Sequence, residues 1–390
     1  MVKVARATVF AVTLALLGCG GGGGGGGGSQ PPASTPPPAG SGGNDSGGED
    51  DADPLGAVGT VEEERARLFA ALGEDVIAAN YSGFEVEMLE VKAAFDTFCV
   101  DPAANDVVLL RSAWRDAMGA WQKASIIRFG PVARNNREFR INLFPDGNDA
   151  VTVNTNQVLD GTTELTEANI ANSAVGAQGL PALEYLLFEL GFADSATATR
   201  RCEFGIAVSD NLTTLAGELR SAWETGGATL TDFLIGTGAT GRDNLVALLE
   251  SIAVTSEIVG DRKLLDAITA GDTELLESER SETSLDNINA NAEALQEFIN
   301  DEAEDTYRLR DYIVRAHMAT SEADLFEAEL ESVRLSIDSF GENSLAAVIG
   351  GMATGDADAL RIAFQQLADL TVDIAVASGV NLGFNNQDGD

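Results

Sequence analysis

Apolar residues recur at steps of three and four along most of the chain, and this spacing limits the fold more than any other feature. Between Asp106 and Ile127 the recurring positions are Leu110, Trp114, Ala117, Met118, Trp121 and Ala124. They form one face of an amphipathic helix. Similar spacing predicts helices at residues 62–79, 84–99, 181–190, 194–223, 230–257, 284–300, 321–340 and 356–377. Because alternating segments typical of strands are scarce, we predict an all-α fold.

One long segment, residues 128–161, departs from this helical spacing. It carries Phe-Gly-Pro, Asn-Asn and Pro-Asp-Gly, and it contains few helix-forming residues. We therefore predict a long loop here, and loops of this length are usually functional or disordered.

The N-terminus is typical of a bacterial lipoprotein signal peptide, which we assign to residues 1–19. Lys3 and Arg6 precede an apolar stretch that is shorter than the about 20 residues needed to span a bilayer. The stretch ends in Leu-Leu-Gly-Cys, the pattern at which such signals are cut before a lipidated cysteine. We predict that Cys19 is lipidated and anchors the protein to a membrane of the cell envelope. Gly20, which follows it, favours the outer membrane, with the body facing the periplasm or the cell surface.

The next segment, residues 20–55, has almost no apolar side chains. Nine consecutive glycines are followed by Pro, Ser, Gly and a short acidic run. Such a composition cannot offset the entropy lost on folding, so we predict a disordered tether.

The body carries a large excess of negative charge, with a formal net charge of −38 for the whole chain. This charge excludes nucleic acid as a partner and favours cationic ligands or metal ions. The body of about 335 residues exceeds what one hydrophobic core usually serves. We predict two packed helical bundles, residues 56–228 and 229–390, separated after Gly226-Gly227.

Cysteine usage points to one disulfide bond. After lipidation, Cys99 and Cys202 remain, and an even number in an oxidising compartment suggests that they are paired. The bridge would close a loop of about 100 residues, worth up to about 4.7 kcal/mol in the chain-entropy model. Two buried free thiols are the alternative.

Histidine is nearly absent, which excludes several kinds of catalytic site. His317 is the only histidine, so a zinc protease with two histidines on one helix cannot be built. No Gly-x-Ser-x-Gly segment exists to form a serine hydrolase site with it.

One segment, from Gly179 to Leu187, resembles the Gly-x-His-x-x-Glu signature of the imelysin family, and more closely a branch of predicted periplasmic lipoproteins. Four further stretches agree with that branch: Ala113–Trp121 running into Ile127–Pro131, Arg200–Cys202, Ser284–Ile288 with Asn291, and Leu382–Asn385 with Asp388–Asp390. The resemblance covers the body from about residue 60 to the end. It implies an all-helical fold of two bundle-like domains with a site in the cleft between them.

The resemblance also supplies the candidate site residues. It carries over Gly179 and Glu184, while Pro181 stands in place of the family's histidine. Without that imidazole, binding of a first-row metal by the motif is in doubt, although Glu184 stays a candidate metal ligand. The alternative role of Glu184 is structural, as a cap or as the partner of an arginine such as Arg128.

Two other segments supply further ligand-binding candidates. Arg128 and Phe129 lie beside a Gly-Pro pair that fixes the direction of the backbone. Asn385 and Asp388 would join the same cleft if the C-terminal tail folds back.

The family is tied to iron or haem acquisition, although it was first described as peptidases. We therefore predict a binding protein without catalytic activity, linked to iron uptake and to an envelope transport component. A carboxylate- or metal-dependent peptidase and an envelope scaffold without a small ligand are the alternatives. The candidate cofactors are iron and other divalent cations.

Overall fold

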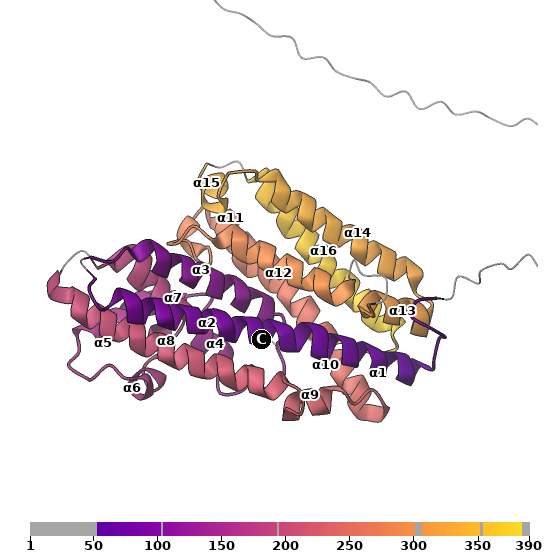
Figure 1. The fold of residues 1–390 in the computed structure, drawn as a ribbon. Helices are drawn as coiled ribbons and strands as arrows, with labels where there is room; N and C mark the ends of the chain where they lie inside the picture. The colour runs from indigo at the N-terminus through magenta and orange to yellow at the C-terminus, as the bar shows by residue number, and fades with distance from the viewer. Residues whose placement is uncertain (1–52, 103, 193–194, 301–305, 352–353, 384–390) are drawn as a thin grey trace, which may run out of the picture. The chain divides into compact units, whose positions relative to one another are not determined.

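Helices make up every regular element in the part of the chain that the structure describes (Figure 1). The structure is a computed structural model that describes residues 53–102, 104–192, 195–300, 306–351 and 354–383. The predicted all-α fold is therefore confirmed over these residues. The predicted signal peptide, the lipidation at Cys19 and the tether as far as residue 52 lie outside them.

The elements, in chain order, are α1 (Val61–Ala71), η1 (Leu72–Ile77), α2 (Ala78–Phe98), α3 (Val107–Ala124), α4 (Arg137–Ile141), η2 (Gly147–Asp149), α5 (Ala150–Asp160), α6 (Glu167–Ala171), η3 (Val175–Ala177), α7 (Leu180–Glu184), η4 (Tyr185–Leu190), α8 (Ser195–Trp223), α9 (Ala228–Phe233), α10 (Gly238–Glu257), η5 (Ile258–Leu265), α11 (Asp266–Ala270), η6 (Thr273–Leu275), α12 (Ser284–Ile299), α13 (Leu309–His317), α14 (Thr320–Ser339), α15 (Leu345–Gly350) and α16 (Gly355–Ala377). The π-helical elements η1, η4 and η5 continue the α-helices that precede them. A membrane-spanning helix, long and apolar enough to cross a bilayer, is not found among these elements.

The first two predicted helices form one continuous helical run, from Val61 to Phe98. Its start is fixed by a capping box, in which the Thr60 side chain accepts from the Glu63 backbone and the Glu63 carboxylate accepts from the Thr60 backbone. The expected break near residue 80 does not occur, because Tyr81 and Phe84 are both fully buried and the packing face continues through it.

The long helix α2 packs against α3 on one side and α8 on the other (Figure 1). Trp114 and Trp121 of α3 point into this core and are 0% and 1% exposed. The ring of Trp121 lies 5.2 Å from that of Phe84. The two tryptophans are therefore core residues, as their spacing on one helix face predicts.

The C-terminal helices pack around α16, which contacts α14 and α10. Leu360, Phe364 and Leu367 of α16 are fully buried in these contacts. Helix α12 contacts both α3 and α14, so it joins the C-terminal helices to the N-terminal ones (Figure 1). The division of the body at residue 228 stays a prediction.

The prediction of an uninterrupted loop over residues 128–161 is wrong, because this segment contains α4, η2 and α5. The Asp146 carboxylate accepts from the backbone N–H groups of Ala150 and Val151, at 2.7 and 3.1 Å, and so starts α5. Val151 and Thr155 are 1% and 0% exposed. Tertiary packing thus outweighs the weak helix propensity of these residues.

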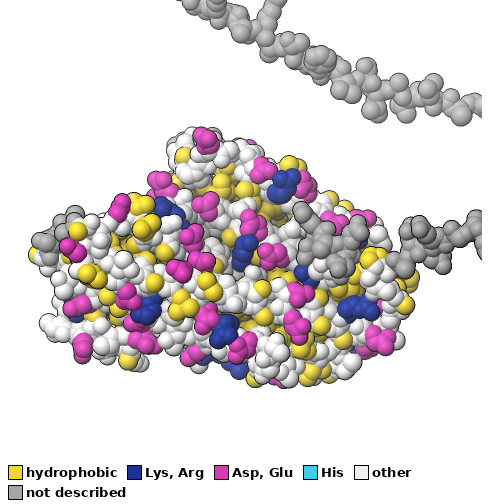
Figure 2. Space-filling view, viewed as in Figure 1, with side chains coloured by type: hydrophobic (Ala, Val, Ile, Leu, Met, Phe, Trp, Pro, Cys, Tyr) yellow, Lys and Arg dark blue, Asp and Glu magenta, His cyan; other side chains and the backbone are white. Residues whose placement is uncertain are grey.

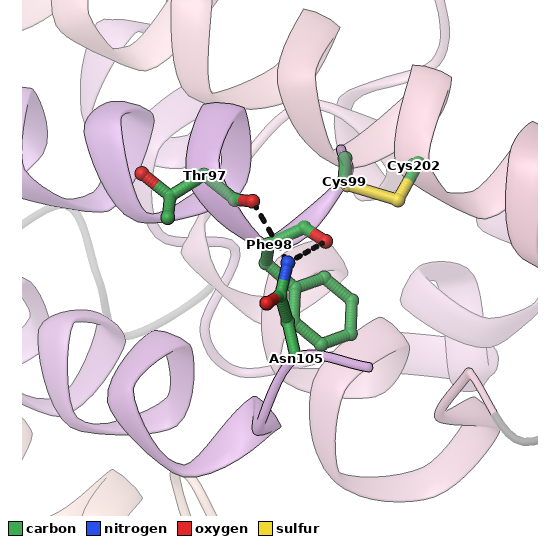
Figure 3. The surroundings of a disulfide bond; sticks show 5 residues. All are labelled: Thr97, Phe98, Cys99, Asn105 and Cys202. Atoms are coloured by element: carbon green, nitrogen blue, oxygen red, sulfur yellow. Dashed lines mark hydrogen bonds between the residues drawn. A yellow bond between two sulfur atoms is a disulfide. The ribbon is translucent and has the colours of Figure 1, made fainter. Parts of the chain in front are cut away.

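The disulfide between Cys99 and Cys202 joins the end of α2 to α8 (Figure 3). The side chain of Asn105 donates to the backbone oxygens of Thr97 and Phe98, both at 3.1 Å, and so closes the turn that leads from α2 to α3. The predicted disulfide is present in the structure.

Arg315 of α13 attaches the first described residues to the body and also contacts the buried side chain of Glu64. Glu64 is 0% exposed and accepts from the Tyr307 hydroxyl at 2.7 Å and from the Arg315 guanidinium at 3.3 Å. Arg315 also donates to the Gly56 carbonyl at 2.8 Å and pairs with Asp53. Arg315 therefore holds residues 53–56 against the body.

Candidate functional site

Eleven charged side chains line a cavity of about 550 Å³. Its wall combines residues from 142–152, from α7 and η4, and from 272–280, with Arg262 and Asp266 beside them. Nine carboxylates and two guanidinium groups line it, so its potential is strongly negative. Asp and Glu side chains also prevail over Lys and Arg on the molecular face in Figure 2.

Close backbone approaches bring these separate segments together. A Cβ atom on Gly179 would lie 2.5 Å from the Ile141 carbonyl oxygen, and one on Gly176 would lie 2.5 Å from that of Ala150. Only glycine therefore fits at either position without a shift of the backbone. The Trp114 indole donates to the Leu180 carbonyl at 3.0 Å and ties the start of α7 to α3.

Helix α7 presents two positions of the recognised motif to the cavity. Pro181 lies in its first turn, where the missing backbone N–H costs nothing. Glu184 follows three residues later on the same helix face, and both residues line the cavity. A histidine at position 181 would therefore face the cavity beside Glu184.

The Glu184 side chain is buried and only partly satisfied. It is 2% exposed, and its Oε1 accepts from the Ser281 backbone N–H at 2.9 Å and from the Ser281 hydroxyl at 2.7 Å. Its Oε2 has no hydrogen-bond partner among the described residues. Burial raises the pKa of Glu184 to about 7, against the lowering effects of Ser281 and the Arg280 charge. The carboxyl group is thus poised between its neutral and charged forms near neutral pH.

Arg280 spans the cavity wall from one segment to another. Its guanidinium donates to the Glu189 carboxylate at 2.8 Å and to the Thr152 hydroxyl at 3.1 Å. It also lies 5.4 Å from the centre of the Tyr185 ring. This one side chain therefore ties α5 to η4 across residues that are far apart in the sequence.

A buried polar network lies behind the cavity. Lys263 Nζ is 2.7 Å from Glu277 Oε2 and donates to the side-chain oxygens of Gln122 and Asn291, at 2.7 and 2.8 Å. Asn142 Nδ2 donates to the other Glu277 oxygen at 2.7 Å. Burial lowers the pKa of Lys263, while the charge of Glu277 opposes the change. Glu277 and Asn142 also line a small adjacent pocket of about 50 Å³.

The Arg128 candidate is near this network but does not pair with Glu184. Its guanidinium forms an ion pair with Glu138, and the residue lines the small pocket. The proposed partnership with Glu184 is therefore wrong, since Ser281 fills that role. Phe129 packs against Trp223 and Phe233, at 5.6 and 5.7 Å between ring centres, as part of an aromatic cluster.

The other predicted positions lie away from the cavity or outside the described residues. The His317 ring is 3.0 Å from the Tyr312 hydroxyl, and burial lowers its pKa. Asn385 and Asp388 belong to the undescribed tail, as Cys19 belongs to the undescribed N-terminus.

The sequence reasoning missed Ser281, Arg280, Glu277 and Lys263. The first three lie in an irregular stretch between η6 and α12, where no periodicity marks them. Lys263 had no clear local signal either, because Asp261, Arg262 and Asp266 are charged neighbours of Lys263-Leu264-Leu265.

The described residues do not fit an imidazole-ligated iron or haem site. His317 does not line the cavity, and Cys99 and Cys202 are in the disulfide. Within the described ranges, no three His, Cys, Asp or Glu side chains form a group that could hold a metal ion. The cavity is instead a set of separate oxygen acceptors suited to positively charged groups.

The sequence profile of the family described as Imelysin matches residues 77–374. The chain belongs to the imelysin family. This match covers the cavity-lining residues, Pro181 and Glu184 among them.

Two solved structures share the imelysin fold with this chain. An imelysin-like protein from Psychrobacter arcticum 273-4 is 17% identical, with a TM-score of 0.71, over 84% of this chain and 99% of that one. A putative iron-regulated protein A precursor from Parabacteroides distasonis ATCC 8503 is 18% identical, with a TM-score of 0.68, over 83% and 96%. None of the curated proteins matches the chain.

Proposed function

We propose that this imelysin-family protein is a non-catalytic binding protein of the cell envelope that takes a positively charged ligand into its acidic cavity. The observation that carries the proposal is the position of Glu184: a 2% exposed carboxylate that lines a cavity of about 550 Å³. A buried carboxylate with an oxygen that lacks a donor gains from a cationic partner.

The proposal includes the location and the architecture that the sequence predicts. The protein is exported, lipidated at Cys19 and anchored in the outer membrane, as a member of a lipoprotein branch of the family. Two bundles, residues 56–228 and 229–390, frame the cavity. In support, the cavity lining includes Glu184 before residue 228 and Arg280 after it.

A role in iron acquisition, beside an envelope transport component, completes the proposal. Its support is the name of one distant structural relative, the putative iron-regulated protein A precursor from Parabacteroides distasonis. Since the described cavity residues offer no imidazole or thiolate, we place the iron link in the uptake process and not in a haem ligand of this chain.

Isothermal titration of the purified protein with cations tests the binding function. We expect saturable binding of a cationic ligand that Glu184→Gln weakens. A deletion strain grown under iron starvation tests the iron link, with a growth defect as the expected result. If no cation binds and the strain grows normally, the proposal fails.

Hydrolysis is the second candidate, because Glu184 has a pKa of about 7 at a cavity wall. A carboxyl with this pKa can act as a general acid or base at neutral pH. Turnover of a peptide library, in the presence of divalent metals, would support this candidate. Glu184→Gln should then abolish turnover while the helical circular dichroism is retained.

A further inference from the structure

The cavity wall combines acidic and apolar side chains. Leu143, Phe144, Val151, Leu275 and Leu276 line it together with the carboxylates. A compact metal ion gains nothing from such apolar surface. A ligand with methylene groups does gain, because the burial of each CH₂ against apolar side chains is favourable.

The carboxylates are divided among separate segments of the wall. Asp146 lies in the segment before α5, Glu184 on α7 and Glu274 on η6. A calcium ion requires about six to eight oxygens at roughly 2.3–2.6 Å from one point. Acceptors that are distributed along a wall match a ligand whose positive charges are also separated.

Two acceptors in the wall have no donor among the described residues. Asn142 Oδ1 is buried without a hydrogen-bond partner, and both hydrogen bonds to the Glu184 carboxylate reach Oε1, which leaves its Oε2 without a donor there. Both residues line the cavity. A buried acceptor without a donor costs free energy, and an ammonium group carries N–H donors and no acceptor.

We infer that the cavity binds a chain-like organic ammonium ion, in which at least two cationic groups are separated by methylenes. One ammonium group contacts Glu184, a second contacts the acidic segment around Glu274, and the methylenes lie against the apolar wall. The inference rests on the proposed function and specifies its ligand. Such a chain is a polyamine.

Isothermal titration of the mature lipidated protein in detergent micelles distinguishes these ligands. The probes are spermidine, putrescine, the ferric hydroxamate chelate ferrioxamine B, and CaCl₂. We expect an organic ammonium ion to bind at least about tenfold more tightly than Ca²⁺, and Glu184→Gln to weaken it by about tenfold. Tighter binding of spermidine would support a polyamine ligand, whereas tighter binding of ferrioxamine B, which carries a single ammonium group, would overturn the requirement for two separated charges.

Two further variants separate an effect on binding from an effect of Glu184→Gln on folding. Glu274→Gln changes an exposed cavity carboxylate and should also weaken binding. Glu331→Gln on α14 removes the same charge outside the cavity and should leave the affinity unchanged.

The outcomes separate the inference from the proposed function. Binding of Ca²⁺ with no binding of any amine would overturn the inference and leave the cation-binding function in place. Binding of neither kind of cation would overturn both. Equal weakening by Glu184→Gln and Glu331→Gln would show attraction to the whole acidic surface, and would overturn the assignment to this cavity.

Discussion

Lys263 Nζ lies 2.7 Å from Glu277 Oε2, and the two residues are each 5% exposed. Each charge compensates for the desolvation of the other, because one buried charge without a partner would cost several kcal/mol of stability. Glu277 also holds Asn142 of the cavity wall through its second oxygen. The pair thus supports the cavity from behind.

Removal of one member of this pair should destabilise the fold strongly. We expect Glu277→Gln to lower the free energy of unfolding by about 3–5 kcal/mol, because Lys263 would keep a buried charge without a partner. The double variant Lys263→Met with Glu277→Gln should lose less than Glu277→Gln alone. Urea denaturation at pH 7 measures both, and a single-variant loss below about 1 kcal/mol would contradict the argument.

The stability of the protein should depend on pH through Glu184. Its folded pKa of about 7 lies above its ordinary value of 4.5, so the folded state holds the proton more tightly than the unfolded state. The contribution of Glu184 to the free energy of unfolding is therefore fully present below about pH 4.5 and is lost as the pH rises to about 7. The total loss from this one group is on the order of 3 kcal/mol. Glu184→Gln should remove this part of the fall. Urea denaturation of both proteins at several pH values measures the difference, and parallel curves would refute it.

Much of the fold could be predicted from local patterns, whereas the site could not. The faces of α3, α12 and α16 repeat within one helix, so the sequence shows them directly. Glu184 and Ser281 are 97 residues apart, and Lys263 and Gln122 are 141 apart. Only the packing of α3, α7, η5 and the segment before α12 brings such residues together, and no spacing within one element encodes it.

The close approach at Gly179 predicts a sharp difference between two glycine substitutions. Gly179→Ala would place a methyl group 2.5 Å from the Ile141 carbonyl oxygen, and we expect a loss of about 1–3 kcal/mol from overpacking. Gly119→Ala, within α3, meets no atom within 4 Å and should raise stability by about 1 kcal/mol. Thermal unfolding of the two variants compares them. Similar melting temperatures would show that α4 can move aside.

The disulfide should contribute to stability through the length of the loop that it closes. Its cysteines are 103 residues apart, so the double variant Cys99→Ser with Cys202→Ser should lose about 2–5 kcal/mol. Guanidinium denaturation of the variant and of the oxidised protein measures the loss. Treatment of the wild type with a reductant should reproduce it, while the variant should not respond to the reductant.

A histidine at position 181 should create a zinc site at the cavity wall. Pro181 and Glu184 face the cavity from one helix turn, so Pro181→His would place an imidazole beside a carboxylate. We expect the Pro181→His variant to bind Zn²⁺ at least about tenfold more tightly than the wild type does. Isothermal titration measures the change, and the added substitution Glu184→Gln should reverse it. Equal Zn²⁺ affinities for wild type and Pro181→His would refute this geometry.

The contacts of Arg315 determine where mechanical tension enters the body. Arg315 joins Asp53, which is 262 residues earlier in the chain, and α13 in turn contacts α1 and α14. Tension on the chain before Asp53 is therefore shared by helices from both ends of the sequence. Neither α1 nor α13 contributes a residue to the cavity lining, so such a load would enter the body away from the cavity wall.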